Sequence, residues 1–208
     1  GAMAPDIDVV ARLRGDYVYL KHHRGISHSL PALLILALII TKSLSYFFID
    51  FNFIQVFLWT SLGCLSHTLF DILNSYGAKL LMPFSKKKAT VGILMLYDPV
   101  VTVLSLFLIF QKEKSPLFYM SILLIFALYL QIRMHMKNKA KEVIEEYYKH
   151  GYKIEDITVL PALMAFYKWD FIVRTSSHSI VGQINSYSKK ITERKKLKRS
   201  DQETLKLF

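Results

Sequence analysis

Residues 30–49 read LPALLILALIITKSLSYFFI, a run of twenty residues in which Lys42 is the only charged side chain. A helix needs about 20 mainly apolar residues to cross the hydrocarbon core of a bilayer. A soluble helix at a protein surface shows a polar face at 3.6-residue spacing, and residues 30–40 contain no polar side chain. This stretch therefore predicts a transmembrane helix, with a leucine-rich soluble bundle as the weaker alternative.

Three further apolar runs follow along the chain, at residues 53–73, 91–110 and 117–132. The first two meet the length of a membrane span, and the third is short but ends at Arg133, whose long side chain can reach the interface. We therefore expect a mainly α-helical fold, a polytopic membrane bundle of about four transmembrane helices.

The basic residues give this bundle an orientation. They flank the apolar runs in the N-terminal segment, in the second loop and after residue 132, whereas the first loop, around Asp50 and Asn52, has none. Basic residues in short flanking loops mark the cytoplasmic side of a membrane. We expect a multi-pass protein of the inner or plasma membrane, with both ends of the chain in the cytoplasm.

The charge of the chain narrows the classes of partner. Its 208 residues carry a formal net charge of +11, with 52% hydrophobic residues, which favours an anionic membrane surface, a nucleic acid or an acidic substrate. The aromatic residues form no RNA-recognition motif, so no nucleic-acid partner is expected. The single cysteine, Cys64, excludes a disulfide framework and a cysteine-rich zinc module.

The second half of the chain is polar and basic. Residues 133–208 hold 16 of the 27 lysines and arginines, so we expect a membrane-embedded domain over residues 1–132 and a basic cytoplasmic tail over residues 133–208. The tail is expected to form a small α+β appendage with a helix over residues 137–149 and β-like segments at 169–174 and 179–184.

The basic run at residues 194–199 is a candidate for contact with lipid. Lysine and arginine near an anionic surface each contribute roughly 1 kcal/mol of attraction. We therefore expect this run to touch anionic lipid headgroups, with a solvated tail as the alternative.

Ionisable residues converge at the cytoplasmic ends of the predicted spans. Such residues are costly within a membrane and are functional candidates. The expected topology places the end of the second span, the start of the third span and the segment before residue 30 at the same depth. The ionisable residues of these segments are His23, His28, His67, Asp71, Asp98, Asp6 and Asp8. This convergence is the strongest functional signal in the sequence.

His67 and Asp71 are four residues apart, so they lie on one face of a helix, one turn apart. Helices present ligands to a divalent ion in this way, but a structural His–Asp hydrogen bond remains an alternative. Asp98 precedes Pro99 and could equally cap a helix. Arg24 is placed to hold a phosphate group, because its guanidinium binds phosphate bidentately.

The motifs, taken in order, resemble those of a known family. Ala4-Pro5-Asp6-Ile7-Asp8, the segment 23–29 (HRGISHS), His67-x3-Asp71-x2-Asn74-x2-Gly77 and the segment 83–85 (PFS) are similar to the membrane-bound metal-dependent hydrolases of the YdjM/YfhP type. The resemblance extends to about residue 187, through Trp169 and Gly182. Family members usually begin with a further apolar segment before the Pro-Asp-Ile-Asp motif, so we expect that this chain lacks that segment.

The resemblance implies a chemistry. The family is distantly similar to zinc-dependent phospholipase C, which implies His67 and Asp71 as metal ligands, with His28, His23, Asp6 and Asp8 as their partners. The ligand set favours Zn²⁺, with Mn²⁺ as an alternative, and Arg24 and Asp98 are the candidate catalytic residues. We expect a hydrolase acting on a lipid-like phosphoester at the cytoplasmic face of the bilayer. A non-enzymatic membrane scaffold and a metal-binding ion carrier are the alternatives.

Overall fold

The computed structural model describes residues 1–7, 9, 25–112, 115–163 and 165–198. The chain forms two compact units, residues 1–92 and 93–208. The domain boundary expected at Arg133 falls within a continuous helix of the second unit, α5 (Pro116–Lys149). No proline or glycine interrupts the sequence where the apolar run meets the polar one, so the helix continues through that point.

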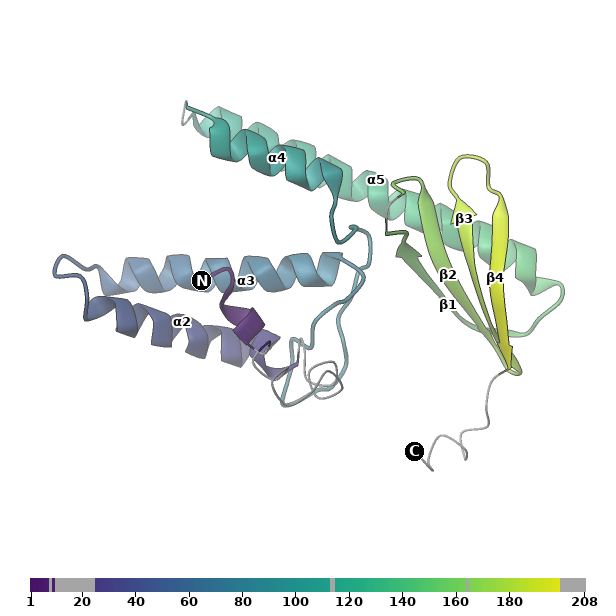
Figure 1. The fold of residues 1–208 in the computed structure, drawn as a ribbon, viewed down its shortest axis with the longest axis horizontal. Coiled ribbons are helices and arrows are strands. Elements are labelled where there is room, and N and C mark those ends of the chain that lie inside the picture. The colour runs from purple at the N-terminus through teal and green to yellow at the C-terminus, as the bar shows by residue number, and fades with distance from the viewer. Residues whose placement is uncertain (8, 10–24, 113–114, 164, 199–208) are drawn as a thin grey trace. The chain divides into compact units, whose positions relative to one another are not determined.

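The first unit is a helical hairpin. The short 3-10 helix η2 (Ile26–His28) leads into α2 (Leu30–Ser45), which lies beside α3 (Phe53–Leu73) (Figure 1). The side chain of Asn52 starts α3 by accepting a hydrogen bond from the backbone N–H of Gln55 at 3.1 Å, as an N-cap residue does. The buried face of α2 repeats at one-turn spacing and consists of Leu33, Ala37 and Thr41.

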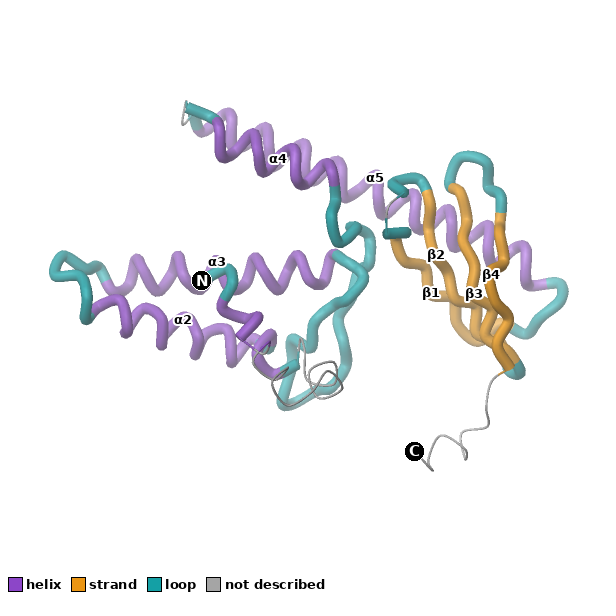
Figure 2. The backbone as a smooth tube through the Cα atoms, in the orientation of Figure 1, coloured by secondary structure: helices purple, strands orange, loops and turns teal. Residues whose placement is uncertain are grey.

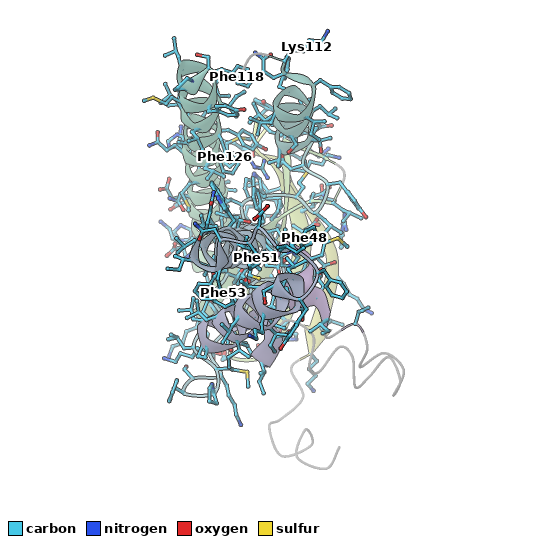
Figure 3. All side chains as sticks on the ribbon, turned by 90° about the vertical axis from the view of Figure 1, so that its left-hand side faces the viewer. Phe48, Phe51, Phe53, Lys112, Phe118 and Phe126 are labelled. Atoms are coloured by element: carbon cyan, nitrogen blue, oxygen red, sulfur yellow. The ribbon has the colours of Figure 1, made fainter. Side chains whose placement is uncertain are left out.

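The turn between α2 and α3 exposes aromatic side chains. Phe48 and Phe53 are 59% and 38% exposed, and Figure 3 labels both beside Phe51. The rings of Phe51 and Phe53 meet edge to face, with 6.4 Å between their centroids. An exposed cluster of this kind is typical of a surface that contacts another apolar phase.

The expectation of a bundle of four transmembrane helices is wrong. Within the described part of the chain, α3 and α5 are the two helices that are long and apolar enough to cross a membrane. α2 has 16 residues and α4 (Pro99–Phe110) has 12, which correspond to about 24 and 18 Å of helix. Both are shorter than the hydrocarbon core of about 30 Å.

Local helix-start signals explain why the third apolar run, residues 91–110, forms only a short helix. The Asp98 carboxylate accepts hydrogen bonds from the backbone N–H groups of Val100 and Val101 at 3.1 and 3.3 Å, and Pro99 occupies the first turn. This is a strong N-cap. The helix therefore begins at Pro99, and the apolar residues before it are not helical.

The expectation of a mainly α-helical fold is also wrong, because the second unit is α+β. Its antiparallel sheet contains β1 (Ile154–Pro161), β2 (Lys168–Thr175), β3 (His178–Asn185) and β4 (Ile191–Lys198) in that order (Figures 1 and 2). One sheet face packs on the C-terminal half of α5, and α5 contributes Ala140, Ile144 and Tyr148 to that core. The strands contribute alternate residues, among them Val159, Trp169, Phe171, Val173, Ile180 and Ile184.

The expected β-like segments lie within β2 and β3, and the expected helix is the C-terminal part of α5. β1 and β4 are additional strands. Most of the basic run at 194–199 belongs to β4, which pairs with β3. The basic run, for which a solvated tail was the alternative, is therefore part of an edge strand as far as Lys198.

Candidate metal centre

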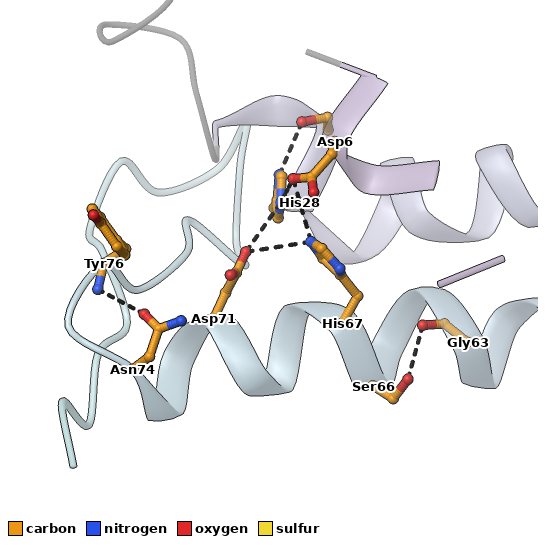
Figure 4. A network of polar contacts seen from close by, with 9 residues as sticks. Asp6, His28, Gly63, Ser66, His67, Asp71, Asn74 and Tyr76 are labelled. Carbon is orange, nitrogen blue, oxygen red and sulfur yellow. Dashed lines mark hydrogen bonds and ion pairs between the residues drawn. The ribbon is translucent and has the colours of Figure 1, made fainter. Parts of the chain in front are cut away.

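α3 supplies two of the site's side chains from its last two turns. His67 and Asp71 project from the same face of the helix (Figure 4), and their Nε2 and Oδ2 atoms are 3.7 Å apart. Asp71 is nearly buried, with 7% of its side chain exposed, whereas His67 is 22% exposed. The helix spacing alone therefore places an imidazole and a carboxylate next to each other, as expected from the sequence.

Two other segments complete the cluster. His28, at the end of η2, is fully buried, and its Nε2 lies 3.2 Å from Asp71 Oδ2 and 3.5 Å from Asp6 Oδ1. Asp6 also lies 3.3 Å from His67 Nε2. The four side chains, which we call the His–Asp cluster (Asp6, His28, His67 and Asp71), all belong to the first unit.

The members of the cluster differ in burial. His28 and Asp71 are almost fully buried, whereas 46% of the Asp6 side chain is exposed. Asp6, His28 and His67 each offer one ligand atom, and these atoms lie within 4.8 Å of one another.

The distances between imidazole and carboxylate atoms in the cluster are close to those around a divalent ion. In a tetrahedral zinc site the metal–ligand bonds are about 2.0–2.2 Å, so neighbouring ligand atoms lie about 3.3–3.6 Å apart. The four imidazole–carboxylate N···O distances of 3.2, 3.3, 3.5 and 3.7 Å surround this value. The ligand atoms that all lie within 4.8 Å of one another are those of Asp6, His28 and His67, and Asp71 adjoins this group through its contacts with the two imidazoles. Two imidazoles and two carboxylates are also the donor types that Zn²⁺ and Mn²⁺ accept.

A neighbouring serine orients one imidazole. Ser27 Oγ lies 3.0 Å from His28 Nδ1. If Nδ1 donates its proton to Ser27, then Nε2 keeps its lone pair directed at the carboxylates of the cluster. The sequence analysis did not assign this role to Ser27, although its position next to a candidate ligand was a usable signal.

The chain after α3 holds the end of the helix in place. Gly77 N–H donates to the backbone carbonyl of Asp71 at 2.8 Å, and Ala78 pairs with Ala89 in an isolated bridge. Gly77 has φ +65°, and a Cβ there would lie 2.4 Å from the Ala89 carbonyl oxygen. Only glycine fits this position, which explains its place in the motif His67-x3-Asp71-x2-Asn74-x2-Gly77.

Replacing Gly77 by alanine should destabilise the protein by about 2–4 kcal/mol, because the left-handed backbone and the steric clash both oppose it. Thermal unfolding of the full chain in detergent, followed by circular dichroism, measures the change. Gly151 is the matched control, since a Cβ there meets nothing within 4 Å. Equal losses at the two glycines would contradict this explanation.

The other sequence-predicted residues have different positions. His23, Asp8 and Arg24 lie outside the described residues. Asp98 belongs to the second unit, where it caps α4 and accepts a hydrogen bond from the Tyr129 hydroxyl at 2.7 Å. These contacts give Asp98 a structural function, and its catalytic role stays a prediction.

Comparison with known proteins places this geometry in a family. The family model described as YdjM inner membrane protein matches residues 1–140. A curated relative, the "Uncharacterized protein YfhP" of Bacillus subtilis (strain 168), is 34% identical over 186 residues, which is 88% of this chain and 56% of the relative. The chain thus spans little more than half of that relative's length.

No solved structure matches the chain. The family model covers well over half of the chain and includes the whole His–Asp cluster, all of α3 and the part of α5 up to residue 140. The chain belongs to the YdjM inner membrane protein family.

Proposed function

We propose that this membrane protein is a metal-dependent hydrolase in which the His–Asp cluster binds Zn²⁺ or, less favourably, Mn²⁺. The observation that carries the proposal is the meeting of four nitrogen and oxygen atoms from three separate segments at N···O distances of 3.2–3.7 Å. A His–Asp hydrogen bond that only joins two segments would need one such contact, not four. A divalent ion needs several donors from different elements.

The cluster suits hydrolysis because it combines buried ligands with a partly exposed carboxylate. A bound metal ion would lower the pKa of a coordinated water towards about 7 and polarise the scissile group. His28 and Asp71 hold the buried side through their contact at 3.2 Å. Asp6, with 46% of its side chain exposed, is the ligand nearest to solvent and the one beside which we propose that substrate enters.

A phosphoester with a lipid-like body is the substrate class that we favour. The cluster is built on the last two turns of α3, an apolar helix long enough to cross a membrane, which supply His67 and Asp71. A group at the end of such a helix lies near the depth of lipid headgroups. Arg24 is the candidate phosphate-binding residue, in keeping with the bidentate contacts that arginine makes.

We further propose that the apolar half of α5 enters the bilayer and that the sheet lies on the cytoplasmic side. Residues 116–132 of α5 carry no charge, and Arg133, Lys137, Lys139 and Lys141 follow them before the first acidic residue, Glu142. Basic residues that follow an apolar span in this way mark its cytoplasmic end.

The experiment that tests the hydrolase uses the purified full chain, stripped with a chelator and reloaded with Zn²⁺ or Mn²⁺. Bis-p-nitrophenyl phosphate, p-nitrophenyl phosphate and a phosphatidylglycerol vesicle serve as the phosphoester panel. We expect metal-dependent hydrolysis that a chelator removes and added metal restores. Stoichiometric metal with no hydrolysis of any phosphoester would reject the enzyme.

A membrane scaffold is the second candidate, and the same distances support it. A protonated imidazole can form an ion pair with a carboxylate at 3.2–3.5 Å without any metal. In that case the cluster would only hold η2 and α3 together. Absence of metal after loading, with thermal stability unchanged by zinc, is the result that this candidate requires.

Ser27 gives a graded test of the metal site. Replacing it by alanine should lower zinc affinity about 10- to 100-fold, because the partner that orients His28 is lost. Competition with a fluorescent zinc chelator measures the affinity. Ser66 is the control, since its hydroxyl donates to the Gly63 carbonyl within α3. Unchanged affinity in the Ser27 variant would mean that His28 is held by packing alone.

A further inference from the structure

The loop end of the sheet lies beside the point where α5 changes from apolar to basic. Arg133 is fully buried, and its guanidinium donates to the Phe166 carbonyl at 2.7 Å in the β1–β2 loop. The same guanidinium lies over the ring of Trp169, 4.3 Å from its centroid. The β1–β2 loop is therefore fixed at the level of the first charged residue after the apolar half of α5.

Hydrogen bonds join the turn between β3 and β4 to the β1–β2 loop, at the same end of the sheet. The Ser186 backbone N–H donates to the Tyr167 carbonyl at 2.8 Å, and the Trp169 indole N–H donates to Ser186 Oγ at 2.9 Å. The rings of Tyr167 and Tyr187 lie 6.1 Å apart. Figure 1 shows both connections at the same end of the sheet.

This end exposes an unusual combination of side chains. Leu163 is 66% exposed, Tyr187 is 75% exposed and Tyr167 is 40% exposed. Lys168 Nζ lies over the Tyr167 ring at 5.8 Å, and Lys190 is exposed just before β4. Tyrosine and lysine beside an apolar residue are typical of the membrane–water interface, where the rings lie at headgroup level and the cations meet anionic lipid.

The basic run of β4 lies farther from the apolar half of α5. Glu193 accepts a hydrogen bond from the Tyr148 hydroxyl at 2.6 Å, and Lys196 donates to the Tyr152 hydroxyl at 2.8 Å. Tyr148 is fifteen residues after Arg133, or about 22 Å along the helix. Headgroup attraction falls off within about one Debye length, 8–10 Å. The run at 194–198 is therefore poorly placed to contact the bilayer that α5 enters.

We infer that the loop end of the sheet (Leu163, Tyr167, Lys168, Tyr187 and Lys190) is a docking surface for the anionic headgroups of the bilayer that contains α5. The inference rests on the proposed membrane position of α5 and is independent of the hydrolase chemistry. It moves the lipid contact from the basic run of β4 to the opposite end of the sheet. The partner is the lipid surface, since lysines flank an exposed apolar and aromatic group that continues the apolar half of α5.

The test uses the full chain in a Cys64→Ala background, reconstituted into vesicles of phosphatidylcholine with or without phosphatidylglycerol. Single cysteines at Leu124, Ser188 and Ser176 carry a fluorescent probe, and quenchers are placed in the acyl chains, at the headgroups or in water. We expect acyl quenching at Leu124, headgroup quenching at Ser188 only with phosphatidylglycerol, and aqueous quenching at Ser176, in the β2–β3 turn.

The lysines supply the matched comparison. The double substitution Lys168→Gln with Lys190→Gln should lower the ratio of headgroup-quenched to water-quenched probe at Ser188 about 30-fold. Each lysine near the surface contributes about five-fold to this ratio. Lys195→Gln with Lys198→Gln, in the exposed part of β4, should leave it unchanged. The inference fails if the β4 pair has the larger effect, if the probe at Ser188 stays in water, or if the probe at Leu124 is not in lipid. It also fails if the probe at Ser188 is shielded equally without phosphatidylglycerol, because equal shielding would indicate a protein contact.

Discussion

Replacing either His67 or Asp71 by alanine should abolish stoichiometric binding of zinc by the purified protein. Each substitution removes one of the four donor atoms that lie 3.2–3.7 Å from their neighbours. Loss of a group that only orients a ligand already costs about 10- to 100-fold in affinity, so loss of a ligand should cost more. His28→Ala should weaken binding comparably, because its fully buried imidazole contacts Asp71 within the cluster.

Elemental analysis after equal loading with zinc or manganese measures the bound metal, and circular dichroism checks that helicity is retained. His178→Ala is the matched control, because this histidine lies in β3 of the second unit and contacts Ser177 at 2.8 Å. His22→Ala should also retain metal. Full metal content in the His67 and Asp71 variants would show that the cluster is a packing device and would remove the basis of the proposed hydrolase.

The composition of the cluster could be anticipated from the sequence for a simple reason. The spacing of His67 and Asp71 fixes their common face as soon as the segment is a helix. Asp6 and His28 come from other segments, for which the expected topology gave only a common depth, and their role as ligands rested on the family motifs. The structure brings Asp6, His28, His67 and Asp71 together, whereas the orienting Ser27 and the turn at Gly77 depend on backbone geometry that hydropathy does not encode.

The number of membrane spans was wrong because apolar composition does not show where a helix begins or ends. Asp98 and Pro99 carry a readable start signal, and it restricts α4 to 12 residues. The strand β4 was missed because of its charge. β4 carries Arg194, Lys195, Lys196 and Lys198, and basic side chains on an edge strand conceal the alternation that identifies a half-buried strand while they discourage unwanted pairing.

Arg133 is the residue of the second unit whose loss should have the greatest effect on stability. It is fully buried, its Nε donates to the Ile93 carbonyl at 2.8 Å, and its Nη1 donates to the Phe166 carbonyl at 2.7 Å. It also lies over the rings of Phe166 and Trp169. Charged hydrogen bonds contribute about 1.5–3 kcal/mol each, and a desolvated cation–π contact adds about 1–2 kcal/mol.

Arg133→Ala should therefore destabilise the second unit by about 3–5 kcal/mol, or roughly 10–25 °C in melting temperature for a unit of this size. Fluorescence of Trp169 in a Trp59→Phe background follows this unit, since these are the two tryptophans of the chain. Arg133→Lys should recover less than half of the loss, because an ammonium cannot reach two carbonyls in the planar fork of a guanidinium. Arg174→Ala is the control, since its pair with Asp156 at 3.5 Å is about half exposed and such surface pairs contribute about 0–1 kcal/mol. Equal melting temperatures for the Arg133 and Arg174 variants would mean that the sheet holds to α5 through its apolar core alone.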